Sequence, residues 1–385
     1  MSLHAGCQDD ASPSWCRAAV FHEAGRPLTI ERHPRPEPPP GRVRLRVRMA
    51  TLCGSDLKTY LGQRIEPTPT VLGHEFVGVL ETLGPGTSPR DPQGRLLAPG
   101  DRVVVATVAS CGLCFQCVRG LPQKCESTGK CKYGHEPIDG PHGLWTGGLA
   151  DVVLVAPGSG LVKVPDTLPD PIASTASCAG ATVAGTLRVS GGVKGKRVAV
   201  FGAGMLGLTA CAWARWAGAL DIVALDPLSE RLETAARFGA TATLRADDPE
   251  SPARLVHLTG GRGVDLALEL SGHPQAVARA IASVRTGGQV VLIGSVAPGP
   301  TVALDPETVV RRCLTIRGLH NSTPRDLLHA TRFLKAATMF PWAELVPRVY
   351  PLEEVEQAFQ HARDHRPPRV AVALTGSVAQ ANPAR

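Results

Sequence analysis

The sequence KRVAVFGAGMLG, residues 196–207, decides the fold of this chain. Its first part, residues 196–201, is a short run rich in β-branched and aromatic side chains, and a mostly apolar helical stretch, residues 208–217, follows the glycines. A strand, a tight turn and a helix in immediate succession leave free amides and the positive end of the helix dipole where an anion binds. The order predicts a βαβ unit that holds a dinucleotide pyrophosphate. The turn glycines are Gly202, Gly204 and Gly207.

A second strand-like run, residues 221–225, ends at Asp226. A carboxylate at that place accepts hydrogen bonds from the adenosine ribose, and its charge repels a 2′-phosphate. The sequence therefore predicts NAD rather than NADP. A transmembrane helix over residues 198–225 is the competing interpretation, but Arg215, several glycines and the change from strand-like to helical composition argue against it.

Strand and helix patterns continue to alternate beyond Asp226. A helix is expected over residues 229–238, with Ser229 as its N-cap and Gly239 just past its end. Short, mostly apolar runs predict buried parallel strands. The expected strands are 264–270, 289–294 and 314–318, and the expected helices are 275–284 and 325–337. This alternation is typical of a doubly wound parallel sheet, so an α/β Rossmann domain is predicted.

The first 160 residues have a different pattern, with many short strands, frequent Gly and Pro and few helical periods. Such a pattern predicts a β-rich domain of partly open barrel type. At 385 residues the chain exceeds the size at which a single core stops growing, and its 43% hydrophobic content is enough for two cores. Two domains are expected.

Four cysteines cluster after the predicted β-rich strands: Cys111, Cys114, Cys117 and Cys125. Their spacing satisfies the closed tetrahedral coordination of a structural zinc. A pair of disulfides is the alternative, and it needs an oxidising compartment. Residues 1–10 have neither the basic nor the apolar region of a secretory signal, which favours the metal and a cytoplasmic location.

Cys53 and His74 form a second constellation upstream of that lobe. Cys53 lies in Thr-Leu-Cys-Gly-Ser-Asp, residues 51–56, and His74 in Gly-His-Glu-Phe-Val-Gly, residues 73–78. One thiolate and one imidazole on separate loops are two of the three protein ligands that a catalytic zinc uses, because such a site leaves one position open. A third ligand is still required.

The order of these motifs resembles the zinc-dependent alcohol dehydrogenases of the medium-chain dehydrogenase/reductase family, from about residue 17 to the C-terminus. The resemblance implies a GroES-like catalytic domain over residues 1–165, with a structural-zinc lobe at 111–125, completed by residues 345–385. Residues 166–344 would then be the Rossmann NAD-binding domain. It also implies two zinc ions per chain, with Cys178 as the third catalytic ligand and Glu75 as a supporting or transient ligand.

The resemblance assigns further roles, residue by residue. Ser55 matches the hydroxyl that passes on the substrate proton, and Asp56 the carboxylate that fixes the tautomer of the ligand histidine. The positions that would contact the coenzyme are Thr182, Leu206 and Arg369, with Arg369 at the pyrophosphate. Lys58 departs from the histidine of many relatives, and an ammonium of ordinary pKa is a poor proton shuttle. Another relay route, an anion-holding role and a plain exposed lysine all remain open for Lys58.

The substrate is the least determined part of the sequence. Residues 119–125 and 132–136 resemble segments of an alcohol dehydrogenase subgroup associated with phosphonate metabolism. A hydroxyalkylphosphonate is one candidate, and Lys58 or Lys132 would then meet the phosphonate. More generally, the expected reaction passes a hydride between NAD and a primary alcohol, secondary alcohol or polyol. The roles of Cys131, His135 and His142 stay unassigned.

Two other classes of protein remain as alternatives: a zinc-free NAD(P)H-dependent enone or quinone reductase and a non-catalytic NAD-binding protein. No nucleic-acid or membrane partner is expected, because the aromatic content is only 4% and the alternating arginines of residues 42–48 predict a solvated basic face on a strand, although the net charge is +7. Relatives associate through an edge strand of the Rossmann sheet, here residues 290–295 or 314–319, so a homodimer or homotetramer is expected.

Overall fold

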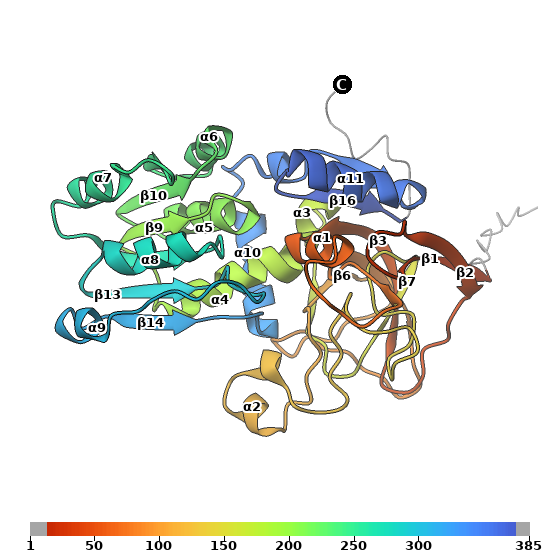
Figure 1. Cartoon of the computed structure of the whole chain (residues 1–385). Helices are drawn as coiled ribbons and strands as arrows, with labels where there is room; N and C mark the ends of the chain where they lie inside the picture. The colour runs from red at the N-terminus through yellow and green to blue at the C-terminus, as the bar shows by residue number, and fades with distance from the viewer. Residues whose placement is uncertain (1–13, 375–385) are drawn as a thin grey trace, which may run out of the picture.

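The computed structural model describes residues 14–374, which form two lobes side by side (Figure 1). One lobe is built on a six-stranded sheet flanked by helices, and the other on two mostly antiparallel sheets with short helices. The predicted α/β class, with a doubly wound parallel sheet and a β-rich domain, is confirmed.

The six-stranded sheet is parallel throughout, in the order β11-β10-β9-β12-β13-β14. Its central strand, β9 (Arg197–Phe201), is buried on both faces, which explains its nearly uninterrupted apolar sequence. The remaining strands are β10 (Asp221–Asp226), β11 (Ala242–Arg245), β12 (Val264–Glu269), β13 (Val284–Leu292) and β14 (Thr315–Gly318). Strand order reverses between β9 and β12, and such a switch point is where ligands bind in open α/β sheets.

Helices connect these strands and cover both faces of the sheet (Figure 1). They are α4 (Ala181–Val189), α5 (Met205–Trp216), α6 (Ser229–Arg237), α7 (Ser251–Leu258), α8 (Pro274–Ser283), α9 (Pro306–Arg311) and α10 (Pro324–Ala336). The apolar stretch 198–225 divides into β9, α5 and β10. Among residues 14–374, no helix has both the length and the apolar character needed to cross a membrane.

The second lobe has a seven-stranded sheet and a three-stranded sheet. The larger one contains β3 (Val43–Leu52), β5 (Glu75–Leu83), β6 (Arg102–Val105), β7 (Val152–Val155), β8 (Leu161–Lys163), β15 (Val349–Pro351) and β16 (Val370–Ala373). The smaller one contains β1 (Trp15–Phe21), β2 (Thr29–Pro34) and β4 (Thr70–Val71). Strand β16 pairs antiparallel with β3, so the chain returns to this lobe after the Rossmann sheet. The parts of the proposed domains before residue 14 and after residue 374 lie outside the described residues.

Short elements complete this lobe and its connection to the Rossmann sheet. They are α1 (Gly54–Tyr60), α2 (Phe115–Val118), η1 (Pro122–Lys124), α3 (Asp170–Ser174), the π-helical turn η2 (Ala176–Gly180), η3 (Trp342–Leu345), η4 (Leu352–Glu354) and α11 (Val355–His365). Two bonds from Arg188 in α4 to Asp326 in α10, of 2.8 and 2.9 Å, brace the helices behind the site. Helix α10 begins with a capping box between Thr323 and Asp326, which fixes its start.

Three sequence predictions need correction. The N-cap of α6 is Leu228 rather than Ser229, since the chain turns one residue earlier where Asp226 accepts a bond from the Leu228 amide. The basic face of β3 is not fully solvated: Arg44 is buried and bound to Glu81 and Glu37. Residues 290–295 are not an edge, because β13 pairs with both β12 and β14.

Candidate active site

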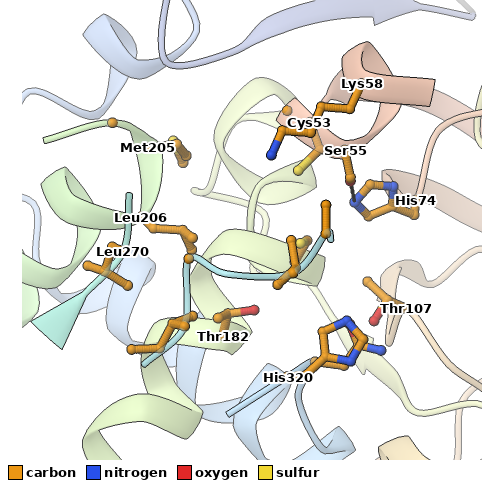
Figure 2. A pocket seen from close by; sticks show the side chains of 18 of the residues that line it. Cys53, Ser55, Lys58, His74, Thr107, Thr182, Met205, Leu206, Leu270 and His320 are labelled. Carbon is orange, nitrogen blue, oxygen red and sulfur yellow. Dashed lines mark hydrogen bonds between the residues drawn. The ribbon is translucent and has the colours of Figure 1, made fainter. Parts of the chain in front are cut away.

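A cavity of about 270 Å³ lies where α1 and the loop before β5 face the coenzyme turn and the ends of β12 and β13. Figure 2 shows Cys53, Ser55 and His74 on one side of it and Leu206, Leu270 and Thr182 toward the other. The cavity therefore brings the predicted catalytic-zinc ligands next to the predicted coenzyme turn.

Cys53, His74 and Cys178 meet at the wall of this cavity. Together with Glu75 they place one ligand atom each within 4.8 Å of one another. Cys53 is the N-cap of α1, His74 directly precedes β5, and Cys178 lies in the π-helical turn η2. Such turns occur often at functional sites because they re-aim a side chain without ending the helix. Thiolate and imidazole ligands at this separation suit a zinc ion.

Asp56 fixes the orientation of His74. Its Oδ1 lies 3.1 Å from Nδ1 of His74, and its Oδ2 accepts the Cys53 amide at 2.9 Å. Burial alone would lower the pKa of His74, but the Asp56 carboxylate and the Cys53 thiol raise it well above its usual value. An Nδ1–H bond to Asp56 leaves Nε2 free for a metal, as in carboxylate–histidine–zinc arrangements. The structure thus gives Asp56 the contact that the sequence predicts.

The thiols of Cys53 and Cys178 have pKa values shifted in opposite directions. The hydrogen bond from Cys178 and the Arg369 guanidinium, whose Nη2 lies 3.4 Å from the sulfur, lower the pKa of Cys53 well below its usual value. The same Cys53 partner and burial raise the pKa of Cys178. A thiolate beside a second thiol can bind a metal cation, because metal binding releases the proton of the second thiol and makes both sulfurs donors.

Glu75 and Arg369 form a buried ion pair directly behind these ligands. Both carboxylate oxygens of Glu75 are 2.7 Å from the guanidinium, and Thr51 also donates to one of them at 2.8 Å. Both side chains are buried, at 0% and 7% exposure. Arg369 was expected at the coenzyme pyrophosphate; it does line the cavity, but its guanidinium is committed to Glu75. Both oxygens of Glu75 therefore already accept hydrogen bonds from protein groups.

The segment around α2, which Figure 1 shows away from the Rossmann sheet, contains a separate cluster of Cys111, Cys114, Cys117 and Cys125. Its sulfur separations are 3.4 Å between Cys114 and Cys117, 3.9 Å between Cys114 and Cys125, and 4.0 Å between Cys111 and Cys117. A disulfide needs about 2.05 Å, whereas four sulfurs about 2.3 Å from one zinc lie about 3.8 Å apart. Backbone amides, first that of Glu126, lower the pKa of Cys114 to about 6. The geometry fits zinc and not the disulfide alternative.

The coenzyme turn is shaped by the absence of side chains at two glycines. A Cβ on Gly207 would lie 1.9 Å from the Gly202 carbonyl oxygen, so only glycine lets α5 start this close to β9. A Cβ on Gly204 would meet no described heavy atom within 4 Å, and Gly204 lines the cavity at the N-terminus of α5. That open space beside free helix amides fits a pyrophosphate.

Asp226 ends β10 and is buried, with 3% of the residue exposed. Its Oδ2 accepts the Ala203 amide at 2.8 Å and its Oδ1 the Leu228 amide at 3.0 Å. A carboxylate has about four lone-pair sites, so it retains acceptor capacity for a ribose. Asp226 therefore also holds the glycine turn in place, a second role that the sequence did not suggest.

Two family models match the chain: the alcohol dehydrogenase GroES-like domain over residues 39–166 and the zinc-binding dehydrogenase domain over residues 206–336. The chain is 32% identical to an NDMA-dependent alcohol dehydrogenase of Amycolatopsis methanolica, over 90% of this chain and 96% of that protein. It is 31% identical to an L-threonine 3-dehydrogenase of Bacillus subtilis, over 86% and 90%. The chain belongs to the zinc-dependent alcohol dehydrogenases of the medium-chain dehydrogenase/reductase family.

Solved structures of the family superpose on the whole fold. An alcohol dehydrogenase from Thermotoga maritima has a TM-score of 0.86 at 26% identity, covering 93% of this chain and 99% of that one. An alcohol dehydrogenase from Thermus sp. ATN1 has a TM-score of 0.82 at 31% identity, covering 93% and 100%. This chain is therefore an oxidoreductase with the two-domain architecture of alcohol dehydrogenases.

Other predicted residues also reach the cavity. Ser55 Oγ lies 3.4 Å from Nε2 of His74, and Lys58, near the end of α1, lines the cavity with its side chain exposed. Thr182 and Leu206 are part of the lining as well. Neither Cys131 nor His142 contributes to the lining among the described residues.

Sequence reasoning missed several lining residues, among them Arg64, Thr107, His320 and Asn321. None of those named lies in a motif, and only the fold brings their loops to the cavity. His135, which was left without a role, also lines it, and its ring centroid is 5.2 Å from that of His74. Its place within residues 132–136 was the one signal in the sequence.

Proposed function

We propose that this alcohol dehydrogenase is zinc-dependent and uses NAD, oxidising an alcohol to an aldehyde or ketone. The observation that carries the proposal is that one cavity has Cys53, His74 and Cys178 at one wall and the Gly204 turn at another. A metal-held hydroxyl and a nicotinamide would then share a single enclosed space. A second, structural zinc in the four-cysteine lobe is part of the proposal.

The residues of the cavity have distinct tasks in this reaction. When bound, zinc supplies Lewis acidity toward the alcohol oxygen and NAD⁺ supplies a hydride acceptor. The reaction breaks one C–H and one O–H bond, transfers the hydride and releases one proton. Ser55, beside His74, would accept that proton from the hydroxyl while it gives up its own hydroxyl proton toward solvent. Apolar lining side chains, among them Leu206, Leu270 and Ile293, exclude water from the hydride path.

Two alternative functions are weaker. A zinc-free enone or quinone reductase would leave the buried set of Cys53, His74 and Cys178, with Asp56 bound to the imidazole, without a purpose. A non-catalytic NAD-binding protein would not need Ser55 at the ligand histidine. The full ligand set therefore favours the zinc-dependent enzyme.

The proposal extends to substrate and assembly. A hydroxyalkylphosphonate is the candidate alcohol that the segments 119–125 and 132–136 suggest. Among the described strands, the Rossmann sheet has two edges, β11 and β14, and β14 is the one that the expected contact uses, so a homodimer or homotetramer through residues 314–319 is expected. Light scattering that shows a monomer at micromolar concentration would contradict this assembly.

The function is tested by NADH absorbance with a panel of primary alcohols, secondary alcohols, polyols and hydroxyalkylphosphonates, with NAD⁺ and NADP⁺ compared in parallel. At least one class should be oxidised with NAD⁺. An enone panel with NADH and NADPH tests the reductase alternative in the same format. Turnover of enones without turnover of any alcohol would reject the proposal.

Asp226→Ala should raise KM for NAD⁺ by about tenfold or more, because a charged hydrogen-bond acceptor for the ribose is lost. The difference in KM between NAD⁺ and NADP⁺ should become smaller, because the variant no longer has the negative charge that repels a 2′-phosphate. Asp221→Ala is the matched control: Asp221 lies at the opposite end of β10, half-exposed and paired with Arg197. If wild type uses both coenzymes equally, this role of Asp226 is wrong.

A further inference from the structure

Basic side chains gather at one end of the cavity. Arg64, Lys132 and His320 line it, together with Asn321 and His135. They come from three separate segments: the loop after α1, the loop that follows the four-cysteine lobe, and the residues just after β14. Neither the proposed metal ligands nor the coenzyme turn uses these side chains, so their convergence needs another explanation.

One carboxylate serves both cations of this basic end. Glu66 pairs with Arg64, and its Oε1 lies 3.0 Å from Nζ of Lys132. Among the described residues, the cavity wall includes Arg64 and Lys132 but not Glu66. Glu66 thus holds the two cations from behind, and one positive charge stays uncompensated on the side that faces the cavity.

His135 links this end of the cavity to His74, one of the proposed metal ligands. His135 is buried, with 7% of the residue exposed, and its Nδ1 makes no hydrogen bond among the described residues, although it lies 3.7 Å from Oε1 of Glu66. Its ring is stacked at a tilt near that of His74, with the centroids 5.2 Å apart. His135, a member of the basic end, is therefore a direct neighbour of His74, where the substrate hydroxyl would be activated.

The surroundings of His320 show that the local potential is positive. Its Nδ1 lies 2.6 Å from Nζ of Lys124. Desolvation, followed by the charges of Lys124, Lys132 and Arg64, lowers the pKa of His320 to about 4. Burial also lowers the pKa of Lys132, with a further contribution from Arg64. Each of these groups would be stabilised by an anion placed between them.

We propose that Arg64, Lys132, His135 and His320 form an anion-binding subsite, and that the substrate is a short alcohol carrying an anionic group. This inference rests on the proposed function and names its substrate class. A guanidinium fork and an ammonium together suit a phosphonate, and they also accept a carboxylate. The short path from His74 to His135 restricts the linker between hydroxyl and anion to a few bonds. If the cluster served structure alone, Glu66 would satisfy it and added anions would not bind.

The test uses three alcohols that share a two-carbon hydroxyalkyl chain and differ in the terminal group: hydroxyethylphosphonate, β-hydroxypropionate and n-propanol. Wild type should show a kcat/KM for one of the anions at least about tenfold above that for n-propanol, as one charge-assisted contact implies. If kcat/KM is higher for hydroxyethylphosphonate, the subsite prefers a dianion. If it is higher for β-hydroxypropionate, the subsite prefers a carboxylate. Either result supports the subsite.

Lys132→Gln should lower the ratio of kcat/KM for the favoured anion to that for n-propanol by about tenfold or more. Arg64→Gln should act in the same direction and covers the case in which the first variant does not fold. Lys194→Gln is the matched control, because Lys194 is an exposed lysine in the loop before β9. A ratio that stays within about twofold of wild type in both variants, with n-propanol still oxidised, overturns the subsite while leaving the proposed function intact.

Calorimetry with hydroxyethylphosphonate and β-hydroxypropionate decides the question if no alcohol is turned over, an outcome that would count against the proposed function only. Binding to wild type that weakens by about tenfold in Lys132→Gln supports the subsite. Absence of binding to wild type, or equal binding to both proteins, overturns it.

Discussion

Replacing Cys53 with alanine should remove one of two zinc ions per chain and lower kcat/KM by at least about a thousandfold, the equivalent of several kcal/mol of Lewis-acid stabilisation. The hydrogen bond from Cys178 and the charge of Arg369 lower the pKa of Cys53, so its loss removes a thiolate donor from the set. Metal content by mass spectrometry and NADH absorbance measure the two effects. The protein should stay folded, because the four-cysteine lobe is a separate cluster.

The control for this variant is Cys211→Ala. Cys211 is a buried free cysteine in α5 that belongs to neither cluster, and burial raises its pKa to about 12. That variant should keep both zinc ions and most activity. A zinc content that is the same in Cys53→Ala as in wild type would show that this cavity is not a metal site.

Arg369→Leu should lower the free energy of unfolding by about 3–5 kcal/mol, because it leaves the Glu75 carboxylate buried without its partner. The pair is joined by two bonds of 2.7 Å, with exposures of 7% and 0%. Urea denaturation followed by circular dichroism measures the change. The double variant Arg369→Leu/Glu75→Leu should recover most of the loss, since no unpaired charge remains.

The matched control is Arg237→Leu, which removes one partner of the exposed Arg237–Glu344 pair, with exposures of 50% and 42%. It should cost less than about 1 kcal/mol, as exposed ion pairs do. Equal stability of Arg369→Leu and Arg237→Leu would mean that the Glu75–Arg369 pair is not the internal support of the ligand cluster that the structure indicates.

Much of the fold could be predicted because its signals are local. The glycine turn at residues 202–207 lies between a strand and a helix as expected, and the predicted runs 221–226 and 264–270 contain strands β10 and β12 of the parallel sheet. The same locality brings the four cysteines of the lobe together, since their spacing alone allows a closed cluster.

The remaining features depend on contacts between distant segments, which no spacing rule describes. Arg369 and Glu75 are 294 positions apart, so their pairing becomes visible only when β16 lies beside β3. Arg44 lies in an alternating sequence that is typical of a strand with one solvated face, but the residue is buried and bound to Glu81 and Glu37. The basic end of the cavity joins three loops, and a loop position has no periodicity from which its direction could be predicted.

The most direct test of the central claim is an anomalous difference map recorded at the zinc absorption edge from crystals of the protein purified without chelator and soaked with NAD⁺. Two peaks are predicted: one among Cys53, His74 and Cys178, next to density for the coenzyme at the Gly204 turn, and one among Cys111, Cys114, Cys117 and Cys125. A peak confined to the four-cysteine lobe, with the three-ligand site empty in zinc-supplemented crystals, would contradict a catalytic zinc in this enzyme.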